Sequence, residues 1–325
     1  MGGNRNHGLK AIAFVVASLG TGAAKAEWTL VDLGALGGRN SYASAVSDSG
    51  IVAGCAETAD GRIHAFVYQA GAMRDLGAGS DVAGDSCALA VNDQGVVAGR
   101  ASTGELVIWT DGGVTNLGIK GNVGGMNASG VVVGARTAGE STRAFVYREG
   151  VVSELGDAST RSEATAINAR GQITGNANGH AFLYDGSMRD LGTLGGNHSN
   201  ARGINARGEV VGGSSNALGA PTPFIYGGGM QALAAPAYSA AIAINTSGQI
   251  VGSGEGIHGY SIEGSTMTPL GMLPDVVAKG WRHLEPTAIN DRGWIVGTAE
   301  NAEGDLRAFV LMPGTRGKPY RPASM

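Results

Sequence analysis

Imidazole, basic and acidic side chains recur at fixed places along this sequence, and they are its first candidates for chemistry. Several short β-type runs open on His or Arg, and the run after each ends on a carboxylate followed by Leu-Gly. If the two runs form an antiparallel hairpin, each basic residue faces one carboxylate. The predicted pairs are His64 with Asp75, Arg143 with Glu154, His180 with Asp190 and, between the two ends of the chain, Arg307 with Asp32. This register also places Phe66 opposite Met73.

Substitutions at these positions occur together, which favours a structural role for the pairs. Where the first position is not basic, the second is not acidic; the examples are Leu106 with Asn116 and Thr222 with Ala232. His258, which would face Pro269, is the exception. Cross-strand charge pairs of this kind contribute a few tenths to about 1 kcal/mol each. We therefore interpret them as structural charge pairs.

Metal and enzyme chemistry find little support in the motifs. A metal site would need the histidines together, whereas His64, His180 and His258 stand in different repeats. The sequence has no G-x-S-x-G, H-E-x-x-H, C-x-x-C, P-loop or EF-hand pattern. We expect no catalytic residue, no metal site and no cofactor.

A repeated unit must position these residues, because one pattern occurs seven times at intervals of about 40 residues. Each copy has Asn, or once Ser, then two residues, Gly, and an apolar run that ends in Gly. Asn suits the first position of a type I turn, and Gly supplies the positive φ that follows. Each copy predicts a turn between two short strands, A and B. The turns of repeats 1 to 7 begin at Ser47, Asn92, Asn127, Asn168, Asn205, Asn245 and Asn290.

Two further strands complete each repeat. Strand C is the run HAFVY from His64 and its equivalents, and strand D is the run MRDLG that ends at Gly77 and its equivalents. Four short strands in about 40 residues are the period of a β-propeller blade. A stack of β-solenoid coils is the alternative architecture.

The two ends of the chain favour the propeller. No D strand follows the last C strand, at Arg307, whereas WTLVDLG at 28–34 is a D strand without a preceding repeat. A ring gains from this borrowed strand because it removes an open edge. The predicted fold class is all-β: a seven-bladed β-propeller of four-stranded blades, closed by the N-terminal strand pairing with the last blade.

These repeats resemble the HAF-repeat family of extracellular bacterial proteins. The tripeptides at His64 and His180, the run DLGTLGG from Asp190 and the run NARGEVVG from Asn205 carry the resemblance, which extends from Trp28 to about Leu311. The repeats near Leu106 and Thr222 depart from the pattern. The resemblance implies export and a repeat architecture, and it implies no activity for any residue.

Composition and the chain ends set the expected boundaries. Hydrophobic residues make up 43% of the 325 residues, enough for a core. Arg5 and Lys10, an apolar run and Ala24-Lys25-Ala26 predict a signal peptide at 1–26. We expect the propeller at 27–312, a basic tail without fixed structure at 313–325, and a secreted monomer, extracellular or periplasmic. The formal net charge of −4 argues against nucleic acid, and no later segment could span a bilayer.

The sequence contains two cysteines, Cys55 and Cys87. An oxidising compartment would permit a disulfide between them, and two buried free thiols are the alternative.

Loop lengths indicate where a partner would bind. The A–B and C–D turns lie on one face and hardly vary, whereas the B–C and D–A connections vary widely on the other, which we call the variable-loop face. The longest connection, 272–286, contains Asp275, Trp281, Arg282 and His283. We expect these four to contact an unknown protein or glycan, although Trp281 could instead cap a hydrophobic gap.

Three functions remain open at this point. The first is a non-enzymatic binding module that acts through the variable-loop face. The second is a propeller hydrolase or lyase with a polar site at the mouth of the central channel. The third is a structural surface or matrix protein.

Overall fold

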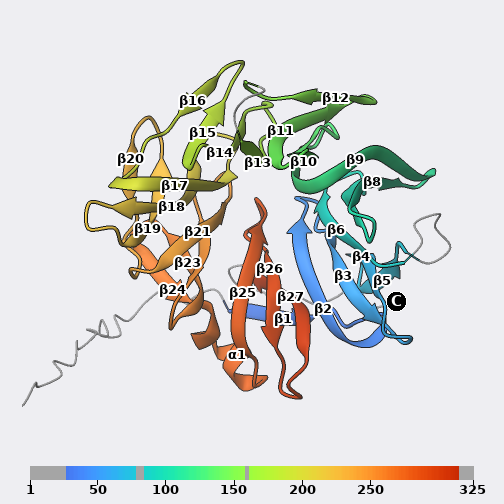
Figure 1. Cartoon of the computed structure of the whole chain (residues 1–325). Coiled ribbons are helices and arrows are strands. Elements are labelled where there is room, and N and C mark those ends of the chain that lie inside the picture. Colours follow the sequence, from blue (N-terminus) through green and yellow to red (C-terminus); the bar gives the residue numbers. More distant parts are fainter. Residues whose placement is uncertain (1–26, 78–83, 158–160, 315–325) are drawn as a thin grey trace, which may run out of the picture.

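The computed structural model describes residues 27–77, 84–157 and 161–314, and most of them lie in antiparallel strands arranged around a common centre (Figure 1). The predicted leader at 1–26 and residues 315–325 of the predicted tail at 313–325 lie outside the described residues. The predicted start of the tail is one residue too early, because the last strand extends to Pro313. No helix in the described ranges has the length and hydrophobicity that a membrane crossing requires.

Six sheets make up the described structure. In five of them the strands follow one another in chain order, and in the sixth the N-terminal strand lies beside the last strand. The first sheet contains β2 (Gly37–Val46), β3 (Val52–Thr58), β4 (Ile63–Gln69) and β5 (Ala72–Asp75). The second contains β6 (Ser86–Val91), β7 (Val97–Ala101), β8 (Glu105–Thr110), β9 (Gly113–Met126), β10 (Val132–Ala138), β11 (Ser141–Arg148) and β12 (Val151–Glu154). The third contains β13 (Ser162–Ile167), β14 (Ile173–Ala177), β15 (His180–Tyr184) and β16 (Met188–Asp190).

The remaining three sheets have four strands each. The fourth contains β17 (Gly195–Ile204), β18 (Val210–Asn216), β19 (Pro221–Tyr226) and β20 (Met230–Ala232). The fifth contains β21 (Ser239–Ile244), β22 (Ile250–Gly254), β23 (His258–Glu263) and β24 (Thr266–Pro269). The sixth contains β25 (Arg282–Ile289), β26 (Ile295–Glu300), β27 (Leu306–Pro313) and β1 (Trp28–Asp32).

The second sheet has seven strands because β9 belongs to two repeats. Its first half pairs with β8, from Gly113 to Lys120, and its second half pairs with β10, from Gly121 to Met126. The predicted strand D of repeat 2 therefore continues directly into strand A of repeat 3. The connection between these two repeats is the shortest in the sequence, so it leaves no room for a separate loop.

Strand β1 is the outer strand of the sixth sheet, where it pairs with β27 from Trp28 opposite Pro313 to Asp32 opposite Phe309. Leu30, at its centre, is 2% exposed and packs in one cluster with Phe309 and Leu311. Burial of these side chains joins the two ends of the described chain through apolar contact as well as main-chain hydrogen bonds.

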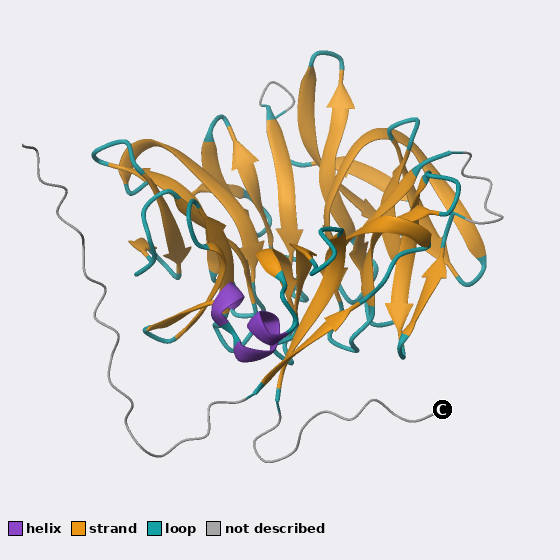
Figure 2. Ribbon diagram, turned by 90° about the horizontal axis from the view of Figure 1, so that it is seen from below, coloured by secondary structure: helices purple, strands orange, loops and turns teal. Residues whose placement is uncertain are grey.

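Two short helices lie at the predicted loop 272–286 (Figure 2). They are η1 (Leu270–Met272), which ends where the loop begins, and α1 (Pro274–Ala278), which packs against β1. The Leu30 amide donates to the Asp275 carboxylate at 2.7 Å, and the Lys279 ammonium donates to the Leu30 carbonyl at 2.6 Å. An uncovered edge invites pairing with other chains, and these two contacts occupy the groups that would take part.

The aromatic residue of strand C packs against the Gly that ends the apolar run of strand B, and each fits only because of the other. Phe66 and its equivalents are the largest fully buried side chains. A Cβ on Gly54, opposite Phe66, would run into the Tyr42 carbonyl and come within 3.0 Å of the Phe66 ring. Only glycine lets strand A, strand B and the ring approach this closely.

The predicted register of the C–D hairpin is wrong by two residues. Strands β4 and β5 pair Phe66 with Asp75 and Tyr68 with Met73. In repeat 2, Leu106 was predicted to correspond to His64, and this is also wrong. Val107 pairs with Gly99 as Phe66 pairs with Gly54. The residue two positions before Val107, Glu105, therefore corresponds to His64. The Trp109 ring lies against Gly99 as the Phe66 ring lies against Gly54. The aromatic residue of strand C therefore stands two positions later in repeat 2 than in repeat 1, which misled the sequence alignment of the two repeats.

A buried serine at the start of strand A joins neighbouring repeats. Its hydroxyl accepts the backbone N–H of the second residue of the preceding strand C. The four bonds run from Ala65 to Ser86, Ala144 to Ser162, Ala181 to Ser199 and Ala308 to Ser41, at 2.8–3.1 Å. In the repeat that contains Ser239, the corresponding residue of the preceding strand C is Pro223, which has no N–H. The Ser239 hydroxyl donates to the Pro236 carbonyl instead.

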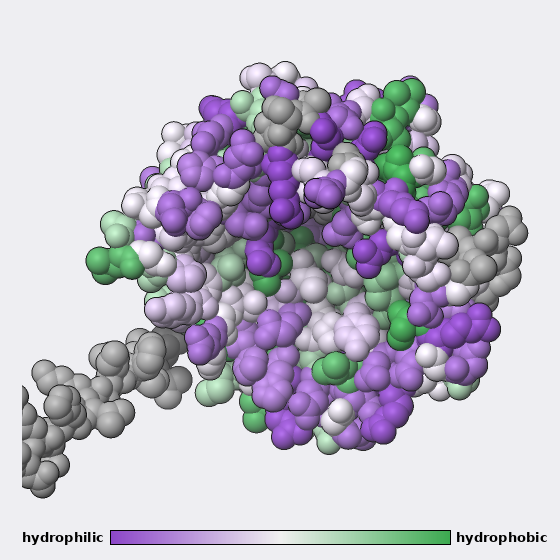
Figure 3. Space-filling model, viewed as in Figure 1, coloured by the Kyte–Doolittle hydropathy of each residue, from purple (hydrophilic) through white to green (hydrophobic). Residues whose placement is uncertain are grey.

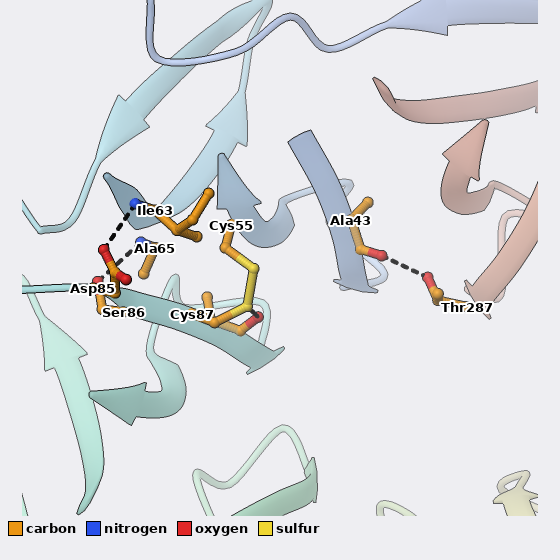
Figure 4. The surroundings of a disulfide bond; sticks show 9 residues. Ala43, Cys55, Ile63, Ala65, Asp85, Ser86, Cys87 and Thr287 are labelled. Carbon is orange, nitrogen blue, oxygen red and sulfur yellow. Dashed lines mark hydrogen bonds between the residues drawn. A yellow bond between two sulfur atoms is a disulfide. The ribbon is translucent and has the colours of Figure 1, made fainter. Parts of the chain in front are cut away.

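A disulfide links repeats 1 and 2 covalently. Cys55 on β3 is bonded to Cys87 on β6 (Figure 4). The Ala65 to Ser86 hydrogen bond and one from Ile63 to Asp85 lie beside it.

The disulfide should contribute substantially to stability, because it closes a loop of 32 residues. Chain-entropy estimates for that length give about 3 to 4 kcal/mol. We expect reductant to lower the free energy of unfolding of the wild type in urea, and to leave a Cys55→Ser, Cys87→Ser variant unaffected. Equal unfolding midpoints for the oxidised wild type and this variant would contradict the prediction.

Candidate functional site

Three of the four predicted charge pairs are in contact. His64 Nδ1 lies 2.9 Å from the Asp75 carboxylate, and His180 Nδ1 lies 2.8 Å from Asp190. Arg143 lies 3.7 Å from Glu154. The pairs form despite the shifted register because the partners are diagonal neighbours across the hairpin, within reach of long side chains.

The acidic partner in the histidine pairs also caps a turn. Asp75 accepts the N–H of Gly77, and Asp190 accepts that of Gly192, both at 2.7 Å. Burial alone would raise the pKa of Asp190, but the Gly192 and His180 contacts outweigh it and lower the pKa below the usual value. These are the contacts that the predicted structural role of His64, Asp75, His180 and Asp190 requires.

The predicted pair of Arg307 with Asp32 is wrong. Arg307 lies 3.5 Å from Asp305, and Asp32 accepts the Gly34 N–H. Asp305 is 9% exposed and also binds Arg39, so it is the stronger competitor for a guanidinium. In repeat 2 the contact is a hydrogen bond from Asn116 to Glu105 at 2.8 Å, and Leu106 is fully buried.

The four residues of the predicted binding loop do not form one surface. Trp281 is 8% exposed and packs in the cluster that contains Leu30 and Leu284. Asp275 is bonded to β1, as described above. Arg282 and His283 are exposed, and both contact Glu300, at 2.9 and 3.2 Å.

His283 belongs to a small polar cluster on the variable-loop face. Its ring centroid lies 4.4 Å from that of His258, whose Nδ1 lies 3.2 Å from Glu285. Across the described ranges no group of three or more His, Cys, Asp or Glu side chains is arranged to hold a metal ion.

A cavity of about 230 Å³ lies at the A–B turns, on the opposite face. Three consecutive residues from each of the seven repeats line it, starting one residue before the turn at Val46, Val91, Met126, Ile167, Ile204, Ile244 and Ile289. Space-filling representation of one face shows the centre of the ring hollowed within a mainly hydrophilic margin (Figure 3).

The asparagines of the turns form a belt of side chains around this cavity. The Oδ1 atom of each accepts two hydrogen bonds from its own turn. In most turns both donors are N–H groups, as for Asn205 from Arg207 and Glu209, whereas Asn245 accepts the Gln249 N–H and the Ser247 hydroxyl. The Nδ2 atom of five of them donates to the backbone carbonyl of the first turn residue in the next repeat. The donors are Asn127, Asn168, Asn205, Asn245 and Asn290, with distances of 2.8–3.3 Å.

The belt is interrupted at two junctions. Repeat 1 has Ser47, which carries no amide, and the Nδ2 atom of Asn92 makes no hydrogen bond within the described residues. The first junction, between repeats 1 and 2, contains the disulfide. The second, between repeats 2 and 3, contains the continuous strand β9. A covalent bond and an unbroken strand therefore hold the two junctions that lack the belt contact.

Three carboxylates, Asp48, Asp93 and Asp291, make one sector of the mouth acidic. Asp48 accepts the Asp291 N–H, Asp93 accepts the Ser49 N–H, and Asp291 accepts from Thr246. Partial burial raises the pKa of Asp48 above its usual value, and the charges of Asp291 and Asp93 add to this effect. Alanines occupy the corresponding positions in repeats 3 to 5.

The lining of the cavity contains no histidine, cysteine, lysine or tyrosine among the described residues. Its hydroxyl–carboxylate contact is the hydrogen bond from Thr246 Oγ1 to Asp291 at 2.7 Å. The walls offer aliphatic surface, carboxylates and one free amide. The turn motif predicted each asparagine, but the convergence of seven turns on one cavity depends on tertiary structure.

Comparison with known proteins places the fold. No protein-family model and no curated protein sequence matches the chain. The structure of YCF48 bound to a D1 peptide has 10% identity and a TM-score of 0.54, covering 89% of this chain and 97% of that chain. The chain folds as a β-propeller.

Two other propellers are more distant. The WD40 propeller domain of Doa1 has 15% identity and a TM-score of 0.49, over 86% of this chain and 96% of that chain. The six-bladed fungal lectin of Aleuria aurantia has 12% identity and a TM-score of 0.37, covering 92% of this chain and 94% of that chain. At these identities structural similarity speaks only for the fold, and membership of the HAF-repeat family stays a prediction.

The belt bonds should stabilise the propeller measurably. Ser47 shows that serine can occupy the turn, so Asn245→Ser removes the donor to Asn290 with little change in the turn. Asn92→Ser is the matched control because its Nδ2 has no partner to lose. We expect Asn245→Ser to lower the free energy of unfolding by about 1 kcal/mol more than Asn92→Ser. Equal losses in urea titrations would contradict a stabilising belt.

Asp48 should make stability depend on pH. The pKa of Asp48 is higher in the folded protein than in the unfolded chain. Its favourable contribution to the free energy of unfolding is therefore complete below the unfolded pKa, and it is lost as pH rises through the folded pKa. Asp48→Asn should therefore gain thermal stability relative to wild type between about pH 3 and pH 7, while still accepting the Asp291 N–H. Exposed Asp111, outside the cavity, provides the control Asp111→Asn. A pH-independent difference would refute this role.

Proposed function

We propose that this chain is an exported, non-enzymatic binding module, a seven-bladed β-propeller that takes its ligand in the cavity at the A–B turns. The convergence of all seven turns on one cavity, with aliphatic walls and polar groups that lack protein partners, carries the proposal. Small-molecule and peptide sites are typically concave, largely apolar and equipped with a few polar groups.

Several observations support seven blades closed by β1. Seven A–B turns line one cavity. Strand β9 supplies strand D of repeat 2 and strand A of repeat 3, so the seven-stranded sheet corresponds to two blades. Strand β1 takes the place of the missing strand D beside β27. Six sheets then correspond to seven blades.

The choice of face follows from how the side chains are engaged. On the variable-loop face, where the sequence favoured a site, Trp281 is buried and Asp275 holds β1. On the turn face, Asn92 and two carboxylates retain free polar atoms. YCF48, a propeller of similar fold, was solved with a bound peptide. We therefore place the ligand site on the turn face.

Export is part of the proposal. The predicted signal peptide at 1–26 and the resemblance to HAF-repeat proteins support it. A disulfide between Cys55 and Cys87 suits an oxidising compartment. We propose a secreted protein, extracellular or periplasmic.

One observation favours a second candidate function, a hydrolase. The raised pKa of Asp48 beside Asp93 and Asp291 resembles the unequal carboxylates that glycoside hydrolysis uses. However, each of these carboxylates already accepts a hydrogen bond from a neighbouring repeat. This engagement favours the binding module.

The face assignment can be tested with tryptophan substitutions at the same position of two Asn-Ala-x-Gly turns. Ala169 lines the cavity in the turn Asn168-Ala-Arg-Gly, and Ala302 stands in the turn Asn301-Ala-Glu-Gly on the variable-loop face. We expect labelled wild-type protein and Ala302→Trp to bind the same members of combined peptide and glycan arrays. Ala169→Trp should lose this binding because the indole fills the cavity mouth. Circular dichroism would verify that each variant is folded.

Three outcomes would overturn the proposal in different ways. Binding lost in Ala302→Trp and kept in Ala169→Trp would return the site to the variable-loop face. Release of cleaved glycan by wild type, abolished in Asp48→Asn, would support the hydrolase. Absence of binding to either array would favour a purely structural protein.

A further inference from the structure

We infer that the cavity at the A–B turns receives a primary ammonium group on an unbranched aliphatic chain, held in the sector between repeats 1 and 2. A lysine side chain of a partner and a free aliphatic amine share this chemistry. The inference rests on the proposed binding function and specifies its ligand.

The anionic side of the sector consists of carboxylates with unused acceptor capacity. Oδ1 of Asp48 accepts the Asp291 N–H at 2.7 Å, and Oδ1 of Asp93 accepts the Ser49 N–H at 2.6 Å. These bonds fix both side chains from neighbouring repeats, and Oδ2 of each has no hydrogen-bond partner in the described ranges. Fixed carboxylates bind a cation at little further cost in side-chain entropy.

Asn92 provides an independent sign of a ligand. It is 5% exposed, it lines the cavity, and its Nδ2 atom makes no hydrogen bond to any described residue. The five belt asparagines use the same atom. This Nδ2 atom is not among the fully buried side-chain atoms without a partner in the described residues, so it is open to the cavity, where a ligand can accept from it. The donor suits an amide carbonyl close to the ammonium.

No basic side chain among the lining residues competes for the carboxylates. The charge of Arg292 acts to lower the pKa of Asp48, but its guanidinium lies over the Trp294 ring, 5.7 Å from the centroid, and forms no ion pair with Asp48 among the described residues. Arg170 and Arg207 bind the carbonyls of Ala206 and Thr246 at the opposite side of the ring. The acidic sector therefore has no basic counter-charge among the residues that line the cavity.

The walls of the cavity favour an aliphatic chain over a sugar. Its apolar lining is Val, Ile, Met and Ala, with no aromatic ring. Sugars usually stack on aromatic side chains, whereas the four methylenes of lysine pack well on aliphatic surface with the charged end at a polar site. About 230 Å³ is sufficient for such a chain.

Calorimetric titration of the whole protein tests the inference directly. The probes are Nα-acetyl-lysine methylamide, 1,5-diaminopentane and the uncharged Nα-acetyl-norleucine methylamide. We expect the wild type and Asp111→Asn to bind at least one amine and not the norleucine compound. The variant Asp48→Asn, Asp93→Asn keeps both backbone contacts and should lose at least about tenfold in affinity.

The other variants identify the source and the position of the ligand. Tighter binding of the lysine compound indicates a partner's lysine, and tighter binding of the diamine indicates a free amine. Asn92→Ser should lower the affinity for the lysine compound about fivefold. It should lower the affinity for the diamine much less, because the diamine has no carbonyl to accept from Asn92. Ala169→Trp should abolish both.

The inference fails if neither amine binds saturably, or if both bind the double Asn variant as tightly as wild type. Array binding that Ala169→Trp abolishes, without amine binding, would leave the proposed function intact and refute the ammonium site alone. Amine binding that survives Ala169→Trp would place the ammonium elsewhere and refute both.

Discussion

The belt of asparagine side chains is the interaction on which this ring depends. Each belt asparagine closes its own turn through Oδ1 and reaches the next repeat through Nδ2. One side chain thus fixes the local conformation and the position of its neighbour. Because the bonds are almost entirely buried, losing one leaves a carbonyl and an amide without water, which costs more than the bond itself contributes in net stability.

The exceptions to the belt show how the ring tolerates gaps. Ser47 cannot reach repeat 2, and there a disulfide joins Cys55 to Cys87. Asn92 does not bond to repeat 3, and there β9 runs through both repeats. At the junction of last and first repeats, Asn290 completes the belt to Ser47 and β1 completes the sixth sheet. Each junction has at least one strong connection.

The gap in the belt also explains where a ligand could act. A fully satisfied ring of amides has nothing to offer a partner. Among the described turns, the sector around Ser47 and Asn92 lacks the belt contact, and the carboxylates of Asp48 and Asp93 stand beside it. If this sector binds the proposed ligand, stability and binding make opposite demands on the same residues, and the disulfide would hold the ring together there.

Much of the architecture followed from sequence alone. The N-x-x-G turns, the four-strand repeat and the all-β class depend on local preferences and on periodicity, which are written in short segments. The contact of His64 with Asp75 also followed, because diagonal neighbours on a hairpin meet even when the register is off by two residues. Only the tertiary structure decided the rest. It merged two strands into β9, turned Arg307 toward Asp305, buried Trp281 beside the helix that packs against β1, and brought seven turns around one cavity. These outcomes depend on contacts between residues far apart in the chain, where competition for space and for partners is settled only once all the repeats are packed together.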